Sequence, residues 1–510
     1  MPVRPLNREQ AFLLPPSLDE LIPDDHQARF VAMVVDSLGE SIWEKLGVEL
    51  EGEPLGAPAY HPRALLSVWL YGFMTRTHSS RRLEAACRDQ VTYLWLTGWQ
   101  HPDHNTLWRF YKAHRKEMRH LFKLSVRTAV KMGLVDLAVQ AVDGTKIAAN
   151  ASRDRTYNVK ELEKLLKRTE EAIRVLEKEN KEGKDPPPIH LPDKLRQAQH
   201  LREEVRAAIE QLRREDKENI NLTDSDANLM KGRQGFVAGY NVETVVSSLK
   251  QKETSKSGLI ITAVDAVMEP DDHNQLIPML EQAEENTGQQ ADISLADAGF
   301  HSGANLAICE ERKQSLVMPE AQEQALKQPY HKDRFIYDAK TDTYQCPQGQ
   351  SLRFVKIKVR KNISRIYRGN AATCRKCIAY GVCTRNHRNG RELQVGEHEV
   401  AIRRHREWMA TEEAKEAYKR RKEIVEPAFG IIKEQVGIRH FLLRGWGNVR
   451  AEATIVATAF NLRTLCSLWQ SWSGKKRQEL IILLKETGQA ILIPALYVKP
   501  ANLNIVAVVK

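Results

Sequence analysis

The sequence predicts an α/β protein, with a mixed sheet and flanking helices preceded by an all-helical N-terminal domain. Three observations predict this class. Residues up to about 135 show the apolar spacing that is typical of helices. From residue 137 onward, short apolar segments rich in β-branched residues alternate with helical segments. A helical hairpin and a cysteine-rich stretch then interrupt this alternation as two inserts.

The composition indicates a globular protein of several domains with a polyanionic partner. The chain has 510 residues, of which 42% are hydrophobic and 28% charged. No apolar run approaches the ~18 residues needed to cross a bilayer, and the N-terminus lacks an apolar signal-peptide core, so we expect a cytoplasmic location. The net charge is +11, yet residues 351–450 alone contain 24 Lys and Arg against 10 Asp and Glu. This concentration favours a polyanion, although a solvated charged surface also explains it.

The N-terminal domain, residues 1–135, is expected to be helical and to contact DNA. "HPRALLSVWLYGFM" is apolar on all sides and has Pro62 at a plausible first helical position, which predicts a buried helix. Further on, a short helix, a Gly/Pro turn and a longer helix follow one another. The longer helix carries Arg109, Lys112 and Arg115 at three-residue steps, as a DNA-reading module would. An ordinary helical bundle is the alternative.

The next region, residues 136–328, is expected to form the first part of a catalytic domain. Its strand in "LAVQAVDGTKIAANAS" is expected to end in Asp143-Gly144-Thr145-Lys146, and a later strand ends at Asp297 in "SLADAGF". We expect these two strands to be neighbours in one sheet. Between them lie two more strands and a helix, and after Asp297 a helix and a short strand follow. This order is compatible with a ribonuclease-H-like fold. Each aspartate alone is weak evidence for chemistry, because carboxylates also commonly end strands.

A helical hairpin, residues 157–216, interrupts the catalytic domain after its first strand. Apolar residues repeat at three- and four-residue steps on both sides of a Pro-rich segment, "KEGKDPPPIHLP". Nothing in the hairpin indicates chemistry, so we expect a structural or dimerising role. Three polar residues near a later helix start, Asp271, Asp272 and His273, are expected to cap that helix.

The cysteine-rich insert, residues 329–400, is expected to be a zinc-ribbon-like unit. A Cys-Pro-x-Gly turn and a Cys-x-x-Cys knuckle supply soft ligands of the kind that tetrahedral zinc favours. A metal-free remnant fold with free thiols is the alternative. The four candidate ligands are Cys346, Cys374, Cys377 and Cys383.

After this insert, residues 401–470 are expected to be helical and to return to the catalytic domain. The helix contains Pro427, which either kinks it or begins a second helix. Glu426 precedes this proline and is flanked on one face by Lys422 and Lys433. A carboxylate between cations on a helix is often only a surface pairing. The tail, residues 471–510, has no assigned role.

Four stretches of sequence together resemble a known family. "AVDGTKIAANAS", "NLTDSDANLMKGRQGFVAGYNVETVV", "LADAGFHS" and "RKEIVEPAFGIIK" resemble bacterial insertion-sequence transposases of the Asp-Asp-Glu (DDE) type. The resemblance is to the subgroup with a helical N-terminal domain and a cysteine-rich insert before the last catalytic helix, and it covers about residues 5–470. It implies a catalytic triad of Asp143, Asp297 and Glu426.

The resemblance also implies cofactors and partners. The three carboxylates would hold two Mg²⁺ (or Mn²⁺) ions, which suit an in-line displacement at phosphorus. The partners would be double-stranded DNA, both terminal inverted repeats and target, and a second copy of the chain on the DNA. We expect the nucleoid to be the place of action. The residues expected to contact DNA are Arg109, Lys112, Arg115, Lys146, Arg421, Lys422 and Lys433.

The signature around the third acid departs from the family by one residue. Related transposases carry Tyr, Arg, Glu and Lys with gaps of two, three and six residues. Here Tyr418 and Arg421 keep the first gap, and Glu426 and Lys433 keep the last, but the middle gap holds four residues. Glu423 is therefore a rival for Glu426. Two other functions stay open: an inactive, transposase-derived DNA-binding regulator, and a metal-dependent nuclease without strand transfer.

Overall fold

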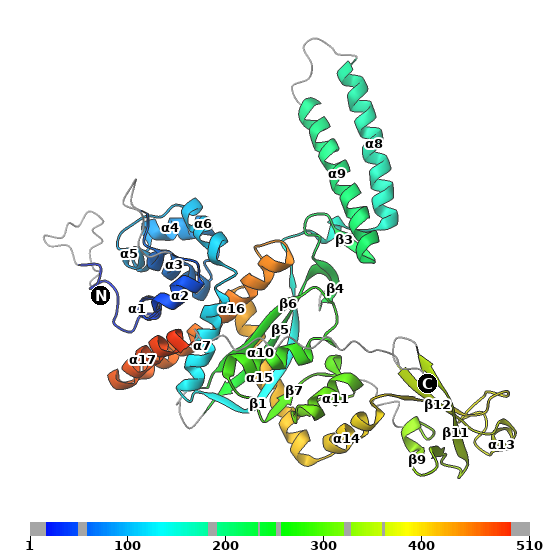
Figure 1. Ribbon diagram of the computed structural model, residues 1–510. Helices are drawn as coiled ribbons and strands as arrows, with labels where there is room; N and C mark the ends of the chain where they lie inside the picture. The colour runs from blue at the N-terminus through cyan, green and yellow to red at the C-terminus, as the bar shows by residue number, and fades with distance from the viewer. Residues whose placement is uncertain are drawn as a thin grey trace, which may run out of the picture.

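The structure is a computed structural model that describes residues 17–48, 59–181, 191–232, 235–250, 257–320, 328–359 and 363–490. A mixed sheet lies at the centre, with helices on both faces (Figure 1). N-terminal helices pack on one side of this body, and a helical hairpin stands away from it (Figure 1). A small second sheet lies apart from the central sheet, at the lower right of the view (Figure 1). In the described part of the chain, no helix is long and apolar enough to cross a membrane.

The central sheet has the order β4-β5-β1-β7-β8. The sixth strand, β6, also pairs with β5. β5 is antiparallel to β1, whereas β7 and β8 run parallel to it. This mixed sheet is consistent with the expected ribonuclease-H-like fold. Its strands are β1 (Val135–Ala148), β4 (Asn228–Gly232), β5 (Gly235–Leu249), β6 (Leu259–Val267), β7 (Ile293–Leu295) and β8 (Ser315–Val317).

The strands that lead to the two aspartates are neighbours, as the sequence predicts. β1 pairs with β7 over Val139–Ala141 only. β1 extends slightly past the expected end in Asp143-Gly144-Thr145-Lys146 and reaches Ala148, because β5 pairs with it along its whole second half. β7 stops at Leu295, and among the described residues the same edge of β1 beyond Ala141 has only an isolated bridge between Ala148 and His440. Asp143 therefore lies at a mid-strand position that is open on one edge.

Helices cover both faces of the sheet. α10 (Leu276–Thr287) and α11 (Gly303–Glu311) pack on one face around Val142 and Val245. The other face is covered by α15 (Glu412–Gly430) and the long α16 (Trp446–Ser471). α14 (Glu399–Met409) packs against α11 and leads into α15. Pro427 does not end α15, which continues to Gly430 and into the π-helix η4 (Ile431–Val436).

The N-terminal helices share one hydrophobic core with the sheet. α16 lies between them and the sheet and contacts α3, α7 and β6. α3 begins at Pro62 and is buried on all sides from Leu65 to Met74, as expected. α17 (Gly474–Ala490) packs on α7 and α2, which places the first part of the tail in this core; residues 491–510 lie outside the described residues. The helices are α1 (Gln27–Asp36), α2 (Glu40–Lys45), α3 (Pro62–Met74), α4 (Ser80–Asp89), α5 (Val91–Thr97), α6 (His104–His114) and α7 (Arg119–Lys131).

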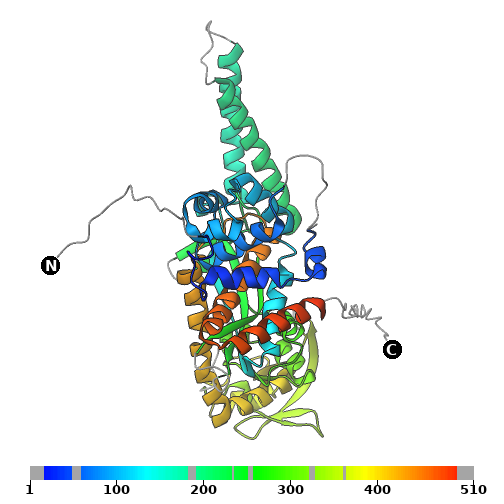
Figure 2. The same ribbon diagram turned by 90° about the vertical axis from the view of Figure 1, so that its left-hand side faces the viewer.

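The two inserts have separate small cores. The helical hairpin consists of α8 (Val159–Lys181) and α9 (Leu191–Glu215) and projects from the body (Figure 2). Its Pro-rich tip lies almost wholly outside the described residues. The turn η1 (Arg153–Arg155) and the strand pair β2 (Thr156–Asn158) and β3 (Asn219–Asn221) join the hairpin to the body. The interior of the hairpin is apolar and includes Leu162, Val205 and Leu212.

The cysteine-rich insert is a five-stranded antiparallel sheet of order β13-β12-β11-β10-β9. Its core gathers Phe335, Tyr344, Tyr367 and Leu393. The turn η3 (Lys332–Arg334) precedes this sheet. The other elements are β9 (Ile336–Asp338), β10 (Thr343–Gln345), β11 (Ser351–Val359), β12 (Ile363–Arg368), α13 (Ala371–Arg375) and β13 (Glu392–Gly396).

Candidate active site

Asp143 and Asp297 face each other across the guanidinium group of Arg421. One nitrogen of Arg421, Nη2, lies 3.0 Å from Asp143 Oδ2 and 3.8 Å from Asp297 Oδ2. Asp143 lies on β1, Asp297 lies two residues after the end of β7, and Arg421 lies on α15. The three residues thus come from segments far apart in sequence. The fold therefore brings two of the three predicted acids to one point, and a cation already lies between them.

The local structure explains why both carboxylates reach this point. β1 and β7 are parallel, so their carboxyl ends lie at the same side of the sheet. Asp297 caps the short 3₁₀ turn η2 (Ala298–Phe300) by accepting a hydrogen bond from the Gly299 N–H at 2.8 Å. This bond holds one oxygen and leaves the other facing Arg421.

Burial controls the charge of Asp143. Desolvation raises the pKa of the Asp143 carboxyl to about 6, because a buried carboxylate loses its hydration. The nearby Arg421 opposes this rise, and the negative charges of Asp297 and Asp272 add to it. The carboxyl oxygens therefore lie in a strongly anionic place where bound positive charge is favoured.

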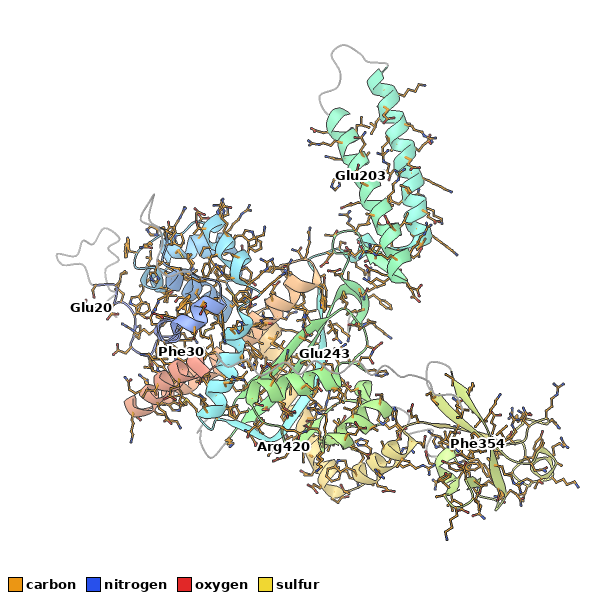
Figure 3. The ribbon with its side chains drawn as sticks, in the orientation of Figure 1. Glu20, Phe30, Glu203, Glu243, Phe354 and Arg420 are labelled. Atoms are coloured by element: carbon orange, nitrogen blue, oxygen red, sulfur yellow. The ribbon has the colours of Figure 1, made fainter. Side chains whose placement is uncertain are left out.

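A second polar network, which the sequence did not predict, lies behind Gly144. Asp272 Oδ1 accepts hydrogen bonds from Lys146 Nζ at 3.0 Å and from Asn241 Nδ2 at 2.5 Å. Asn241 Nδ2 also donates to Glu243, which is fully buried in the sheet (labelled in Figure 3). Burial, and then the charge of Asp272, raise the pKa of Glu243 to about 9, so this carboxyl is protonated at neutral pH.

This network joins the segments that carry the two aspartates. Lys146 follows Asp143 on β1, while His273, next to Asp272, contacts the carbonyl oxygen of Gly299. The expectation that Asp271, Asp272 and His273 cap a helix is wrong, because α10 begins at Leu276 with Gln275 at its N-cap and no side-chain cap. The signal for the buried network was present in "GYNVETVV", where Asn241 and Glu243 occupy alternate positions and therefore face one side of the strand.

Gly144 is required by this network. β1 and β5 place Gly144 directly opposite Glu243. A Cβ atom at position 144 would lie 2.7 Å from Glu243 Oε1 and 3.0 Å from Asn241 Oδ1, closer than side chains tolerate. The glycine thus makes room for a buried carboxyl.

The two candidates for the third acid differ in what the structure shows around them. Glu423 lines a cavity of about 1380 Å³ together with Asp136, near the start of β1. Lys433, the cation expected to accompany Glu426, lies in η4 beyond the end of α15, and its Nζ donates to Thr145 Oγ1 at 2.6 Å. Thr145 is two residues from Asp143. Glu426 itself is exposed and has no hydrogen bond or ion pair within the described residues.

The predicted DNA-contacting residues differ in how they are engaged. Arg109, Lys112 and Lys422 are exposed. The Arg115 guanidinium instead donates to Asn448 Oδ1 at 2.6 Å, which ties α6 to α16. Lys146, Arg421 and Lys433 contact Asp272, the two aspartates and Thr145, as described above. Two of the seven residues are thus paired with carboxylates: Arg421 with Asp143 and Asp297, and Lys146 with Asp272.

The segment "NLTDSDAN" positions the start of α16. Asp224 accepts the Gly445 N–H at 3.2 Å and the Tyr240 hydroxyl at 3.0 Å, and Asp226 accepts the Trp446 N–H at 2.8 Å. These carboxylates satisfy N–H groups at a helix start, so the segment anchors a helix that packs under the sheet.

The four predicted zinc ligands line one small cavity. Three of their sulfurs accept backbone N–H groups: Cys346 from Gln350 at 3.3 Å, and Cys374 and Cys377 from residues 391 and 379 at 3.5 Å. Across the described ranges, no group of three or more His, Cys, Asp or Glu side chains is arranged to hold a metal ion. This holds for the cysteines and for the acids alike.

The donor chemistry nevertheless fits the expected ions. Asp143 and Asp297 present hard oxygen ligands on two sides of a cation, which suits Mg²⁺ or Mn²⁺. The cysteine sulfurs are soft ligands on two turns, which suits Zn²⁺.

Comparison with known proteins gives two family matches. Residues 345–466 match the model of the transposase DDE domain, and residues 16–113 match a transposase domain named DUF772. The first match contains the four cysteines and Glu426, and the second contains α1 to α5 and most of α6. No curated protein and no solved structure matches significantly. The two matches, one toward each end of the chain, indicate an insertion-sequence DDE transposase.

Proposed function

We propose that this transposase cleaves DNA at the ends of its element and joins the freed 3′-hydroxyl groups to target DNA. The observation that carries the proposal is the pairing of Asp143 and Asp297 across one cation, on neighbouring parallel strands. The family matches do not favour an inactive regulator or a nuclease without strand transfer.

Asp143, Asp297 and Glu426 would hold the divalent ions. When bound, two Mg²⁺ or Mn²⁺ ions would activate the attacking oxygen and stabilise the leaving oxygen of the phosphodiester. Arg421 would then have to release the aspartates, and its guanidinium could turn to a DNA phosphate. Lys433, held near the end of β1 by Thr145, is placed to bind a second phosphate.

The cysteine-rich insert would bind one structural Zn²⁺. Support comes from the cavity that all four sulfurs line and from the backbone N–H groups that three of them accept, which hold those sulfurs in place. The DNA partners would be the terminal inverted repeats and the target. A second copy of the chain would be needed because two ends must be held together.

The test compares Glu426→Gln with Glu423→Gln in the full chain. Glu426→Gln removes an anionic ligand but almost no volume, so Mn²⁺-dependent nicking of supercoiled plasmid should fall by about 100-fold or more while the variant binds DNA as the wild type does. Glu423→Gln is the matched control on the same helix and should keep most activity. Asp143→Asn should also abolish nicking.

Three outcomes count against parts of this proposal. If Glu423→Gln is the inactive variant, the third acid has been assigned to the wrong register. If both glutamate variants are active and Asp143→Asn is not, the third ligand lies on another element. If Asp143→Asn retains full activity, the pair of aspartates is not the catalytic centre.

A further inference from the structure

The hairpin of β11 and β12 presents an exposed apolar face. β10 pairs with β11 only at residues 351–353, so the outer half of β11 is an edge strand among the described residues. Phe354 (labelled in Figure 3) and Ile357 are 39% and 58% exposed, and Val359 and Ile363 are 71% and 46% exposed. Val359 and Ile363 are cross-strand partners, so this face continues to the outer end of the hairpin. A patch of large apolar side chains on one projecting element marks an interaction surface.

The same hairpin carries cations without carboxylate partners. Residues 351–368 contain seven Lys and Arg and no Asp or Glu. Arg365 and Arg368 are paired with Asp342 and Glu392. By contrast, Arg353, Lys356 and Lys358 form no ion pair with any residue that the structure describes. Positive charge that the described part of the chain leaves unneutralised beside apolar side chains calls for a partner that is both anionic and able to bury apolar groups.

We propose that the β11–β12 hairpin binds along a groove of duplex DNA, with its lysines on phosphates and its apolar side chains against the bases. This inference rests on the proposed function and adds a binding element to it. Charge complementarity selects DNA over a second copy of the chain, because two copies of this hairpin would bring like charges together. β-hairpins can enter DNA grooves, and apolar side chains can wedge between base steps.

The geometry suits this mode of binding. In β11, Lys356 and Lys358 alternate with Ile357 and Val359, so the cations point to one face and the apolar side chains to the other. An element lying edge-on in a groove turns its two faces to the two walls, so the lysines can reach the phosphates of one strand while the apolar side chains lie against the sugars and base edges of the other. The Lys residues also discourage pairing of the open edge with another strand, and the test must separate that role from DNA binding.

The first experiment removes charge. Lys356→Gln with Lys358→Gln is compared with Lys164→Gln and Lys167→Gln, two exposed lysines on the helical hairpin. Binding of a labelled mixed-sequence duplex of about 30 base pairs is followed between about 50 and 200 mM salt. The β11 pair should lower the slope of log affinity against log salt by about 2, since each phosphate contact contributes roughly one. The control pair should leave the slope unchanged, and an unchanged slope in the β11 pair would overturn the proposal.

The second experiment removes apolar surface. Ile357→Ser with Val359→Ser should weaken binding of the same duplex by about tenfold and leave the salt slope unaltered. The matched control is Val175→Ser with Ile482→Ser, two exposed positions on α8 and α17. If the β11 variant binds DNA normally but turns a DNA-free dimer into a monomer in sedimentation velocity, the occupant is a second copy and the proposal is wrong.

The two levels of inference can fail separately. If the wild-type chain neither binds the duplex nor nicks plasmid, the proposed function fails. If the wild type does both and the β11 variants match it in affinity and slope, only the hairpin proposal is overturned.

Discussion

Single residues at the candidate site act mainly by arranging charge. Arg421 places positive charge between Asp143 and Asp297, and Lys146 places positive charge next to Asp272. Gly144 gives room to Glu243, and a Cβ at Gly299 would lie 2.8 Å from Asp297 Oδ1. Both glycines thus serve neighbouring carboxyl groups.

Replacing Gly144 by Ala tests the buried network. The added methyl group would collide with Glu243 and Asn241, neither of which can move far in a packed sheet, so the free energy of unfolding should fall by about 1 to 3 kcal/mol. Gly447→Ala is the control, because Gly447 lies in α16 with nothing within 4 Å of a new Cβ. Its effect should be small and toward higher stability. Equal stability of Gly144→Ala and the wild type in denaturant titrations would mean that Glu243 does not occupy this space.

At the scale of elements, unequal strand lengths create the site. β1 extends to Ala148 while its neighbour β7 stops at Leu295. α15 crosses the sheet face on which Asp143 lies, and its Arg421 reaches Asp143 there, beyond the end of β7. In the cysteine-rich insert, turns rather than strands bring the candidate ligands together: Cys346 follows β10, and Cys374 lies in α13. This insert has its own core, so its stability can depend on a metal without involving the sheet.

The zinc proposal is tested at this scale. Metal analysis of the purified full chain should find one Zn²⁺, and Cys377→Ser should lose it and reduce solubility, because a structural site contributes to folding of its unit. Cys309→Ser is the control: Cys309 is buried beside α10, away from the insert, and its replacement should leave the zinc content unchanged. A wild-type protein without zinc would show that the cysteines form a metal-free unit.

For the whole molecule, α16 is the element that joins the parts. It packs against α3 and α7 on one side and β6 on the other. Glu452 in this helix is 1% exposed and accepts the N–H groups of Leu442 and Leu443 at 2.9 to 3.1 Å. Burial raises the pKa of Glu452 to about 7, although these N–H groups oppose the rise. A buried, titrating carboxyl therefore couples the stability of the whole body to pH.

The sign of that coupling is predictable. Because the folded-state pKa of Glu452 is raised from 4.5, its protonated form stabilises the fold at low pH, and this contribution is lost as pH rises through about 7. Between about pH 5 and pH 8 the wild type should lose on the order of 3 kcal/mol relative to Glu452→Gln. Denaturant titrations at several pH values measure this difference, with the exposed Glu479→Gln as control. A difference that does not change with pH, or that changes in the opposite sense, would contradict the assignment.

The sequence by itself determined the elements and the order in which they occur. Apolar periodicity was sufficient for the buried α3, for the helical hairpin and for the strands around Asp143 and Asp297, because local spacing decides which face of an element is buried. The order of strands and helices also predicted that the two aspartate-bearing strands are neighbours, whereas their parallel direction is seen in the structure. The transposase resemblance rested on short motifs and agrees with the two family matches.

Only the tertiary structure decided which charges meet. That Arg421 lies between the aspartates, that Asp272 accepts Lys146, and that Arg115 is tied to Asn448 depend on contacts across more than a hundred residues of sequence. No local pattern encodes such contacts, because they arise from how strand lengths and helix packing place side chains in space. For the same reason the spacing of Glu423 and Glu426 could not separate them: the choice depends on where the folded chain places each carboxylate relative to Asp143 and Asp297, and the structure shows Glu423 in the cavity near the start of β1.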